Sequence, residues 1–143
     1  MFLSFDGEPS LDLLIAAARR QGKRLYAPVL HGMTMTFAEL ETSAKLASNF
    51  FGILEPQLGD EIDAREIDLV LAPLVAFDNR GTRIGVGRGY YDRCFGFLRN
   101  RRHWRRPKLL GVAYELQRVP ELASTSWDVP LWAVATEAGV QRF

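Results

Sequence analysis

The sequence predicts one α/β domain over residues 1–143, in three layers, with a mostly parallel central sheet flanked by helices. Strand-like and helix-like apolar patterns alternate along the chain. The run Leu69–Phe77 is almost unbroken in apolar residues, which is typical of a strand buried on both faces of a parallel sheet. A length of 143 residues also suits a single domain.

The composition excludes several classes of protein. Hydrophobic residues make up 48% and charged residues 24%, close to the globular average, which excludes disorder, collagen and coiled coil. The longest apolar run falls well short of the about 20 residues that cross a bilayer, and the first residues lack the pattern of a signal peptide. We therefore expect a cytoplasmic protein without a membrane partner. A single cysteine, Cys94, and two histidines exclude an internal disulfide and a structural zinc set.

The first half of the chain predicts a strand, a helix and a second strand. Phe2–Phe5 is the first strand, and Ser10 is the expected N-cap of a helix that stops at Gly22. Apolar residues recur at helical spacing between these limits: Leu11, Leu14, Ile15 and Ala18. Lys23–Leu30 is the second strand, expected to lie parallel to the first through a right-handed crossover.

The middle of the chain is harder to interpret. Met33, Met35 and Phe37 alternate like a short strand, and the remainder of residues 31–68 is expected to be an excursion and connector. Ile67–Pro73 is the strongest strand and should lie at the centre of the sheet.

The second half predicts a turn, a loop, a helix and two further strands. Asp78–Gly81 is a turn signal, Gly85–Gly89 is a glycine-rich loop, and Tyr90–Leu98 is an amphipathic helix. After a basic loop over Arg99–Lys108, the last expected strands are Leu109–Tyr114 and Leu131–Ala135.

The stretch from residue 81 to 93 carries the chemistry. Glycine at every second position of the loop removes side chains where backbone N–H groups can close on an anion, and a helix follows. Residues 69–143 also carry a net charge of +6, against −5 for residues 1–68. The charged residues around the loop are suited to ATP and Mg²⁺: Arg83, Arg88, Arg93 and Asp92.

Two other phosphate motifs fail on spacing. A Walker loop requires G-x-x-x-x-G-K-[ST], which is absent, and the dinucleotide motif would require glycine at Tyr90. A bare G-x-G-x-G is more often a turn that only reverses the chain. The three arginines and the aspartate nevertheless favour an anion site.

These residues resemble a known family. Pro73-Leu-Val-Ala-Phe-Asp78, followed by Gly81-x-Arg-x-Gly-x-Gly-x-Gly-Tyr-Tyr-Asp-Arg93, is similar to the signature of the 5-formyltetrahydrofolate cyclo-ligases, also called 5,10-methenyltetrahydrofolate synthetases. Further matches follow in the family's order: Gly52-Ile-x-Glu-Pro56, Gly111-Val-Ala-Tyr-x-x-Gln117 and Trp127-Asp-Val-Pro130. The resemblance covers essentially the whole chain and implies the family's Rossmann-like layered fold.

The resemblance implies an ATP- and Mg²⁺-dependent ligase that converts 5-formyltetrahydrofolate to 5,10-methenyltetrahydrofolate. ATP binding is carried over to nine consecutive residues: Arg83, Ile84, Gly85, Val86, Gly87, Arg88, Gly89, Tyr90 and Tyr91. Gly87, Arg88, Gly89 and Tyr90 also face the folate, with Arg88 and Tyr90 in catalytic roles.

The remaining site residues also come from the resemblance. Leu3 and Glu8 match positions that line the pterin pocket, although for Glu8 the residues alone favour an acid at a helix N-terminus. Asp92 and Asp128 match Mg²⁺ ligands, although Asp128 alone equally suits the cap of a turn.

Family members begin with about fifty further, mainly helical residues, which this chain is expected to lack. A truncated, non-catalytic folate- or nucleotide-binding relative is therefore the alternative function. The expected partners are ATP and the folate, with or without a polyglutamate tail, and we expect a monomer or weak homo-oligomer. The basic loop with Trp104 is interpreted as solvated; attraction for polyglutamate is a second interpretation, and nucleic acid is not an expected partner.

Overall fold

The backbone divides into two units, residues 1–63 and residues 64–143, and each is described by itself. The computed structural model describes residues 1–4, 7–100 and 106–143. Half of the predicted basic loop over Arg99–Lys108, residues 101–105, therefore lies outside the described residues, as does Phe5 of the first predicted strand.

The first unit contains the predicted helix. It is α1, Asp12–Arg20, and the predicted N-cap is wrong by one residue, because Leu11 rather than Ser10 is at the cap position and, among the described residues, no side chain caps the helix. Ser10 lies one residue earlier, and its Oγ accepts a hydrogen bond from the backbone N–H of Asp12 at 3.2 Å. The helix ends as expected: Gly22 adopts φ +67, a conformation that favours glycine, and its N–H bonds to the carbonyl of Arg19.

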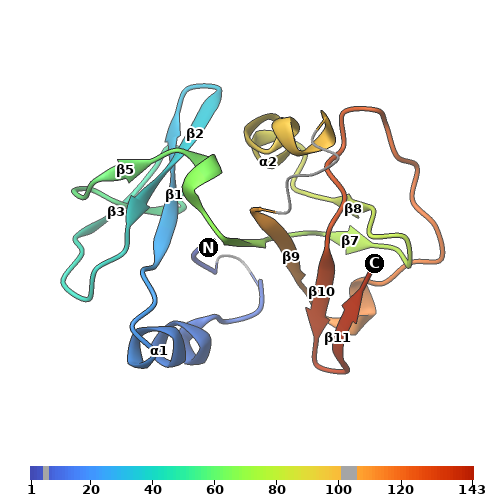
Figure 1. Ribbon diagram of the computed structural model, residues 1–143, viewed down its shortest axis with the longest axis horizontal. Helices are drawn as coiled ribbons and strands as arrows, with labels where there is room; N and C mark the ends of the chain where they lie inside the picture. The colour runs from blue at the N-terminus through green and yellow to red at the C-terminus, as the bar shows by residue number, and fades with distance from the viewer. Residues whose placement is uncertain (5–6, 101–105) are drawn as a thin grey trace. The chain divides into compact units, whose positions relative to one another are not determined.

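The strands of the first unit are all antiparallel. β1, β2 and β5 form one sheet in the order β1-β2-β5, and β3 and β4 form a separate hairpin (Figure 1). Their bounds are Tyr26–His31, Thr34–Glu39 and Glu61–Ile62 for the sheet, and Leu46–Ser48 and Leu54–Pro56 for the hairpin. The alternation of Met35 and Phe37 predicted β2 correctly, since both side chains are buried.

Three expectations for the strands of this unit are wrong. Residues 2–4 form no strand. The second predicted strand is β1, and it pairs antiparallel with β2 through a two-residue turn in which Gly32 adopts φ +62. Residues 31–62 are not mainly a connector, because they contain β2, β3, β4 and β5.

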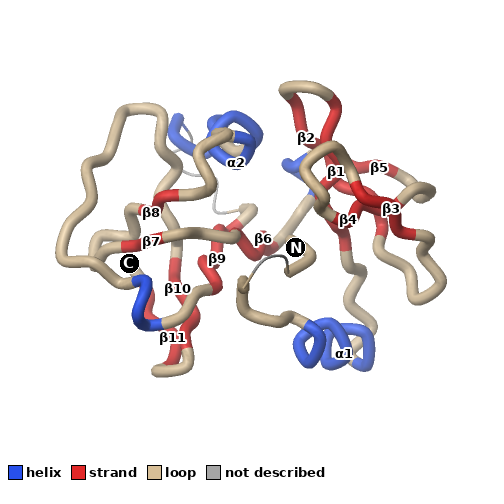
Figure 2. Tube along the Cα trace, turned by 180° about the vertical axis from the view of Figure 1, so that it is seen from behind, coloured by secondary structure: helices blue, strands red, loops and turns tan. Residues whose placement is uncertain are grey.

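The second unit contains a mixed sheet that agrees with the predicted α/β class. The order is β11-β10-β9-β6 (Figure 2). β6, β9 and β10 are parallel, and β11 is antiparallel to β10. Their bounds are Leu69–Ala72, Lys108–Val112, Ala133–Thr136 and Gly139–Arg142 for β6, β9, β10 and β11. β6 is an end strand of this order rather than its centre, which corrects the prediction made from its apolar run. Val70, Leu71 and Ala72 are buried, whereas Leu69 is 47% exposed.

The elements around this sheet are short. β7, Ala76–Phe77, and β8, Arg83–Ile84, form a hairpin around the predicted turn. The predicted helix over Tyr90–Leu98 divides into α2, Tyr90–Cys94, and the 3-10 helix η2, Gly96–Asn100. Two further 3-10 helices are η1, Ala64–Glu66, and η3, Glu115–Gln117. Among the described residues, no helix is long and apolar enough to cross a bilayer.

Candidate active site

The glycine-rich loop is continuous with the β7–β8 hairpin. The N–H of Val75 bonds to the carbonyl of Ile84 at 2.7 Å, and Gly85 begins the loop directly after that pair. The loop then runs to Gly89, which caps α2 in the left-handed conformation. The loop is therefore joined at one end to a paired strand and at the other to a helix.

Two loop glycines are required by backbone conformation. Gly87 has φ +85 and Gly89 has φ +63, values that other residues rarely adopt. A Cβ added at Gly85 or Gly87 would meet nothing within 4 Å, so packing against the protein does not explain the glycines there. The binding of an anion by the backbone N–H groups of this loop stays a prediction.

The predicted ATP residues differ in exposure. Gly85, Gly87 and Arg88 are exposed, Ile84 and Val86 present apolar side chains to solvent, and Gly89, Tyr90 and Tyr91 are half-buried. The Arg93 guanidinium lies 5.0 Å from the centre of the Tyr90 ring, a cation–π distance.

Arg83 has an environment that the sequence did not predict. Its side chain is only 4% exposed, and its Nη2 lies 2.9 Å from Asp92 Oδ1. Its Nη1 donates to the carbonyl of Val129, and the N–H of Val129 donates to the same Asp92 oxygen at 3.1 Å. Arg83 therefore joins β8 to the first turn of α2 and to the segment that contains Asp128.

The two predicted Mg²⁺ ligands lie on adjoining pieces of backbone. Asp92 binds the N–H of Val129, the residue that follows Asp128, and Asp128 Oδ2 accepts the N–H of Thr125 at 2.6 Å. Both of these hydrogen bonds to Asp92, from Arg83 and Val129, are accepted by Oδ1, and the one to Asp128 is accepted by Oδ2. Two carboxylates suit Mg²⁺, which completes its coordination with phosphate oxygens and water. The described residues hold no cluster of three or more metal-ligating side chains.

The predicted pterin residues, Leu3 and Glu8, belong to the first unit, where both are half-buried. Their roles stay predictions.

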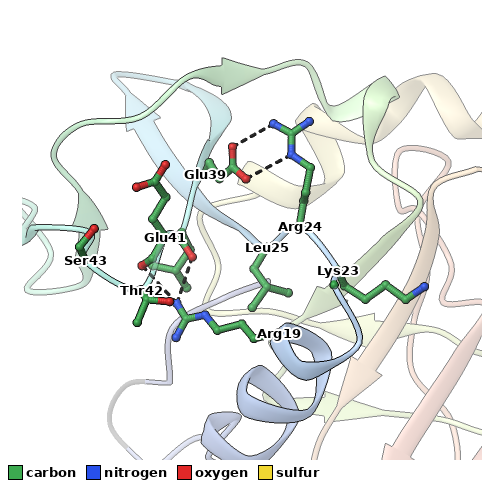
Figure 3. Close-up of a pocket in the computed structure, with 10 residues that line it drawn as sticks. Arg19, Lys23, Arg24, Leu25, Glu39, Glu41, Thr42 and Ser43 are labelled. Carbon is green, nitrogen blue, oxygen red and sulfur yellow. Dashed lines mark hydrogen bonds and ion pairs between the residues drawn. The ribbon is translucent and has the colours of Figure 1, made fainter.

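The first unit also contains an open groove of about 470 Å³ that includes none of the predicted site residues (Figure 3). Two of its cations are engaged: Arg19 donates to the carbonyls of Leu40 and Glu41, and Arg24 pairs with Glu39. We assign no reaction to this groove.

A buried carboxylate supports the hairpin that precedes the loop. Asp78, predicted only as part of a turn, is 0% exposed and accepts the backbone N–H groups of Arg80, Thr82 and Leu122. The Arg80 guanidinium also donates to Asp78 Oδ2. Burial alone would raise the pKa of this carboxyl, but the hydrogen bonds outweigh burial and lower the pKa to about 2.

Comparison with known proteins identifies the family. A model of the 5-formyltetrahydrofolate cyclo-ligase family matches residues 1–137. The chain belongs to this family. The cyclo-ligase of Escherichia coli (strain K12) is 39% identical over 145 residues, which cover 98% of this chain and 78% of that protein. The Haemophilus influenzae cyclo-ligase is 37% identical over 141 residues, covering 94% of this chain and 72% of that protein.

The fold of this chain is similar to that of a solved structure from the cyclo-ligase family. The NMR structure of Aquifex aeolicus 5,10-methenyltetrahydrofolate synthetase superposes with a TM-score of 0.79 at 32% identity, covering 97% of this chain and 68% of that one. This confirms the resemblance seen in the sequence and places the chain in a family of ligases. The site residues of this cyclo-ligase family member stay predictions.

Proposed function

We propose that this chain catalyses the ATP- and Mg²⁺-dependent conversion of 5-formyltetrahydrofolate to 5,10-methenyltetrahydrofolate, with release of ADP and phosphate. The glycine loop over residues 85–89 supports the proposal, because it joins β8 to α2, the helix that contains Asp92, and a Cβ at Gly85 or Gly87 would lie in open space. It also falls within the span that matches the cyclo-ligase family. The expected cytoplasmic location and monomeric or weakly oligomeric state stay predictions.

The proposed reaction has two steps. The formyl oxygen of the folate attacks the γ-phosphorus of ATP, and the bond from that phosphorus to the bridging oxygen of ADP breaks. The nitrogen at position 10 then attacks the activated formyl carbon, loses its proton, and phosphate leaves with the former formyl oxygen. Positioning and neutralisation of charge account for most catalysis in such a transfer.

The residues of this chain take separate parts in the proposal. Backbone N–H groups of the loop and the exposed Arg88 bind the phosphates, and Tyr90 contacts the folate at the end of the loop. Asp92 and Asp128 would hold Mg²⁺, which supplies positive charge to the phosphate oxygens. Leu3 and Glu8 bind the pterin ring.

The test is the near-ultraviolet absorbance of methenyltetrahydrofolate, followed after the chain is mixed with 5-formyltetrahydrofolate, Mg²⁺ and ATP. We expect the absorbance to rise only when all three are present. Thermal stabilisation by folate or ATP without any rise would contradict the proposal and indicate a non-catalytic binding protein.

A further inference from the structure

Gln117, at the end of η3, uses its whole side-chain amide within the protein. Its Nε2 donates to the carbonyl of Leu74 at 2.8 Å and to the carbonyl of Val75 at 3.1 Å. Its Oε1 accepts the N–H of Tyr114 at 2.7 Å. One side chain thus joins the segment after β9 to the segment after β6.

The two carbonyls that Gln117 binds lie at the base of the β7–β8 hairpin. The N–H of Val75 in turn bonds to the carbonyl of Ile84, the last residue before the glycine loop. The path from the Gln117 amide to the start of the loop therefore contains one peptide group and two hydrogen bonds. A shift of Leu74 and Val75 would be transmitted to Gly85.

The hairpin is held at further points by the chain that follows Gln117. The N–H of Val119 bonds to the carbonyl of Phe77 at 2.9 Å, and the Arg118 guanidinium lies 4.7 Å from the centre of the Phe77 ring. The N–H of Leu122 binds Asp78 at the turn. Gln117 holds the open end of the hairpin, which is the end continuous with the loop.

We propose that Gln117 is a positioning residue for the glycine loop, fixing the strand end from which the loop departs. The inference rests on the proposed function, since it assigns the loop to the phosphates of ATP. Gln117 itself touches neither substrate. Its effect arises because displacement of a binding group by about 1 Å can lower a rate by about 10²-fold.

Two variants separate the hydrogen bonds from the size of the side chain. Gln117→Met keeps the length and removes every hydrogen bond of the amide. Gln117→Glu retains an acceptor for Tyr114 but cannot donate to Leu74 or Val75, so it also provides a test if the methionine variant fails to fold. Gln141→Met is the matched control, because it removes one bond to Arg118, which keeps its bonds to Glu115 and Asn79 in the variant.

The first measurement requires no turnover. Amide hydrogen exchange followed by NMR should become faster at Val75 and at Arg93, whose N–H bonds to the carbonyl of Gly89. Exchange within β9 and β10 should be unchanged. Unchanged exchange at both reporter amides, or faster exchange throughout the unit, would overturn the positioning role.

The second measurement is steady-state kinetics. Both Gln117 variants should raise KM for ATP and lower kcat/KM for ATP by about 10- to 100-fold, while Gln141→Met remains close to wild type. Wild-type kinetics in Gln117→Met would overturn the inference. An inactive wild-type chain would instead contradict the proposed function, and the exchange measurement would still decide whether Gln117 fixes the loop.

Discussion

Replacement of Asp78 by asparagine should destabilise the second unit far more than loss of an ordinary surface charge. The Asp78 carboxylate is 0% exposed and accepts three backbone N–H groups, including the N–H of Leu122 from a distant segment. In Asp78→Asn, one oxygen still accepts hydrogen bonds, but an NH₂ group faces the donors at the other position. The variant loses hydrogen bonds to a charged acceptor and leaves buried N–H groups without one. We therefore expect the free energy of unfolding to fall by about 2–4 kcal/mol at pH 7.

The pH dependence of stability gives a second estimate of what the Asp78 carboxylate contributes to the free energy of unfolding. Hydrogen bonds lower the Asp78 pKa from its ordinary value of 3.8 to about 2, so folding favours the ionised form. At pH values above the unfolded pKa, this preference contributes about 2 kcal/mol to the free energy of unfolding. The contribution is lost as pH falls through the folded pKa. Arg80 is 57% exposed and its ion pair is screened, so we credit the backbone hydrogen bonds with most of it.

The assay is urea unfolding of the wild type and Asp78→Asn at pH 7 and at pH 3. Because asparagine does not titrate, the difference in free energy of unfolding between the two proteins should be about 1 kcal/mol smaller at pH 3 than at pH 7. Glu121→Gln is the matched control, since Glu121 pairs with the same Arg80 but is 74% exposed; its expected cost is about 0.5 kcal/mol or less. Equal costs for the two variants at pH 7, or a difference independent of pH, would refute the reasoning.

Three further outcomes are expected. Asp92→Asn should lower the free energy of unfolding, because it removes the charge that pairs with the enclosed Arg83. At a temperature where the variant is still folded, it should also lower turnover and weaken its dependence on Mg²⁺, measured as the absorbance rate against Mg²⁺ concentration; an unchanged profile would remove Asp92 from the metal site. Arg88→Met should raise KM for ATP about tenfold without changing the unfolding midpoint, because Arg88 is exposed; a lowered midpoint would show a structural role. Gly111→Ala should destabilise by about 1–3 kcal/mol in urea unfolding, since the added Cβ would approach Leu131 and Leu74 to 2.8 Å; wild-type stability would show that these leucines move at little cost.

Much of the local structure followed from the sequence, whereas the pairing of strands did not. The helix ending at Gly22, the strand at Met35 and Phe37, and the turn at Asp78 depend on residues near in sequence, and each was predicted. Pairing depends on which segments meet in space. The two-residue turn at Gly32 makes β1 and β2 a hairpin, and the apolar run of β6 describes burial without giving a position in the sheet.

The candidate site shows the same division. The spacing of Gly85, Gly87 and Gly89 predicted a glycine-rich loop before a helix, and the structure has that loop, with positive φ angles at the last two glycines. Its binding of an anion stays a prediction. No pattern near Arg83 indicated that it is enclosed beside Asp92, because the carbonyl of Val129 completes that contact from far along the chain. The sequence likewise placed Gln117 in a family motif without indicating that its amide binds the carbonyls of Leu74 and Val75.

The enclosed Arg83–Asp92 pair also bears on how fast a nucleotide would arrive. Two opposite charges at 2.9 Å largely cancel at a distance, so Arg83 adds little to the field that an approaching polyanion experiences. Long-range attraction then depends on Arg88 and Arg93, which are exposed on the loop and on α2. The association rate constant for ATP should consequently fall less steeply with ionic strength than three solvent-facing arginines would imply.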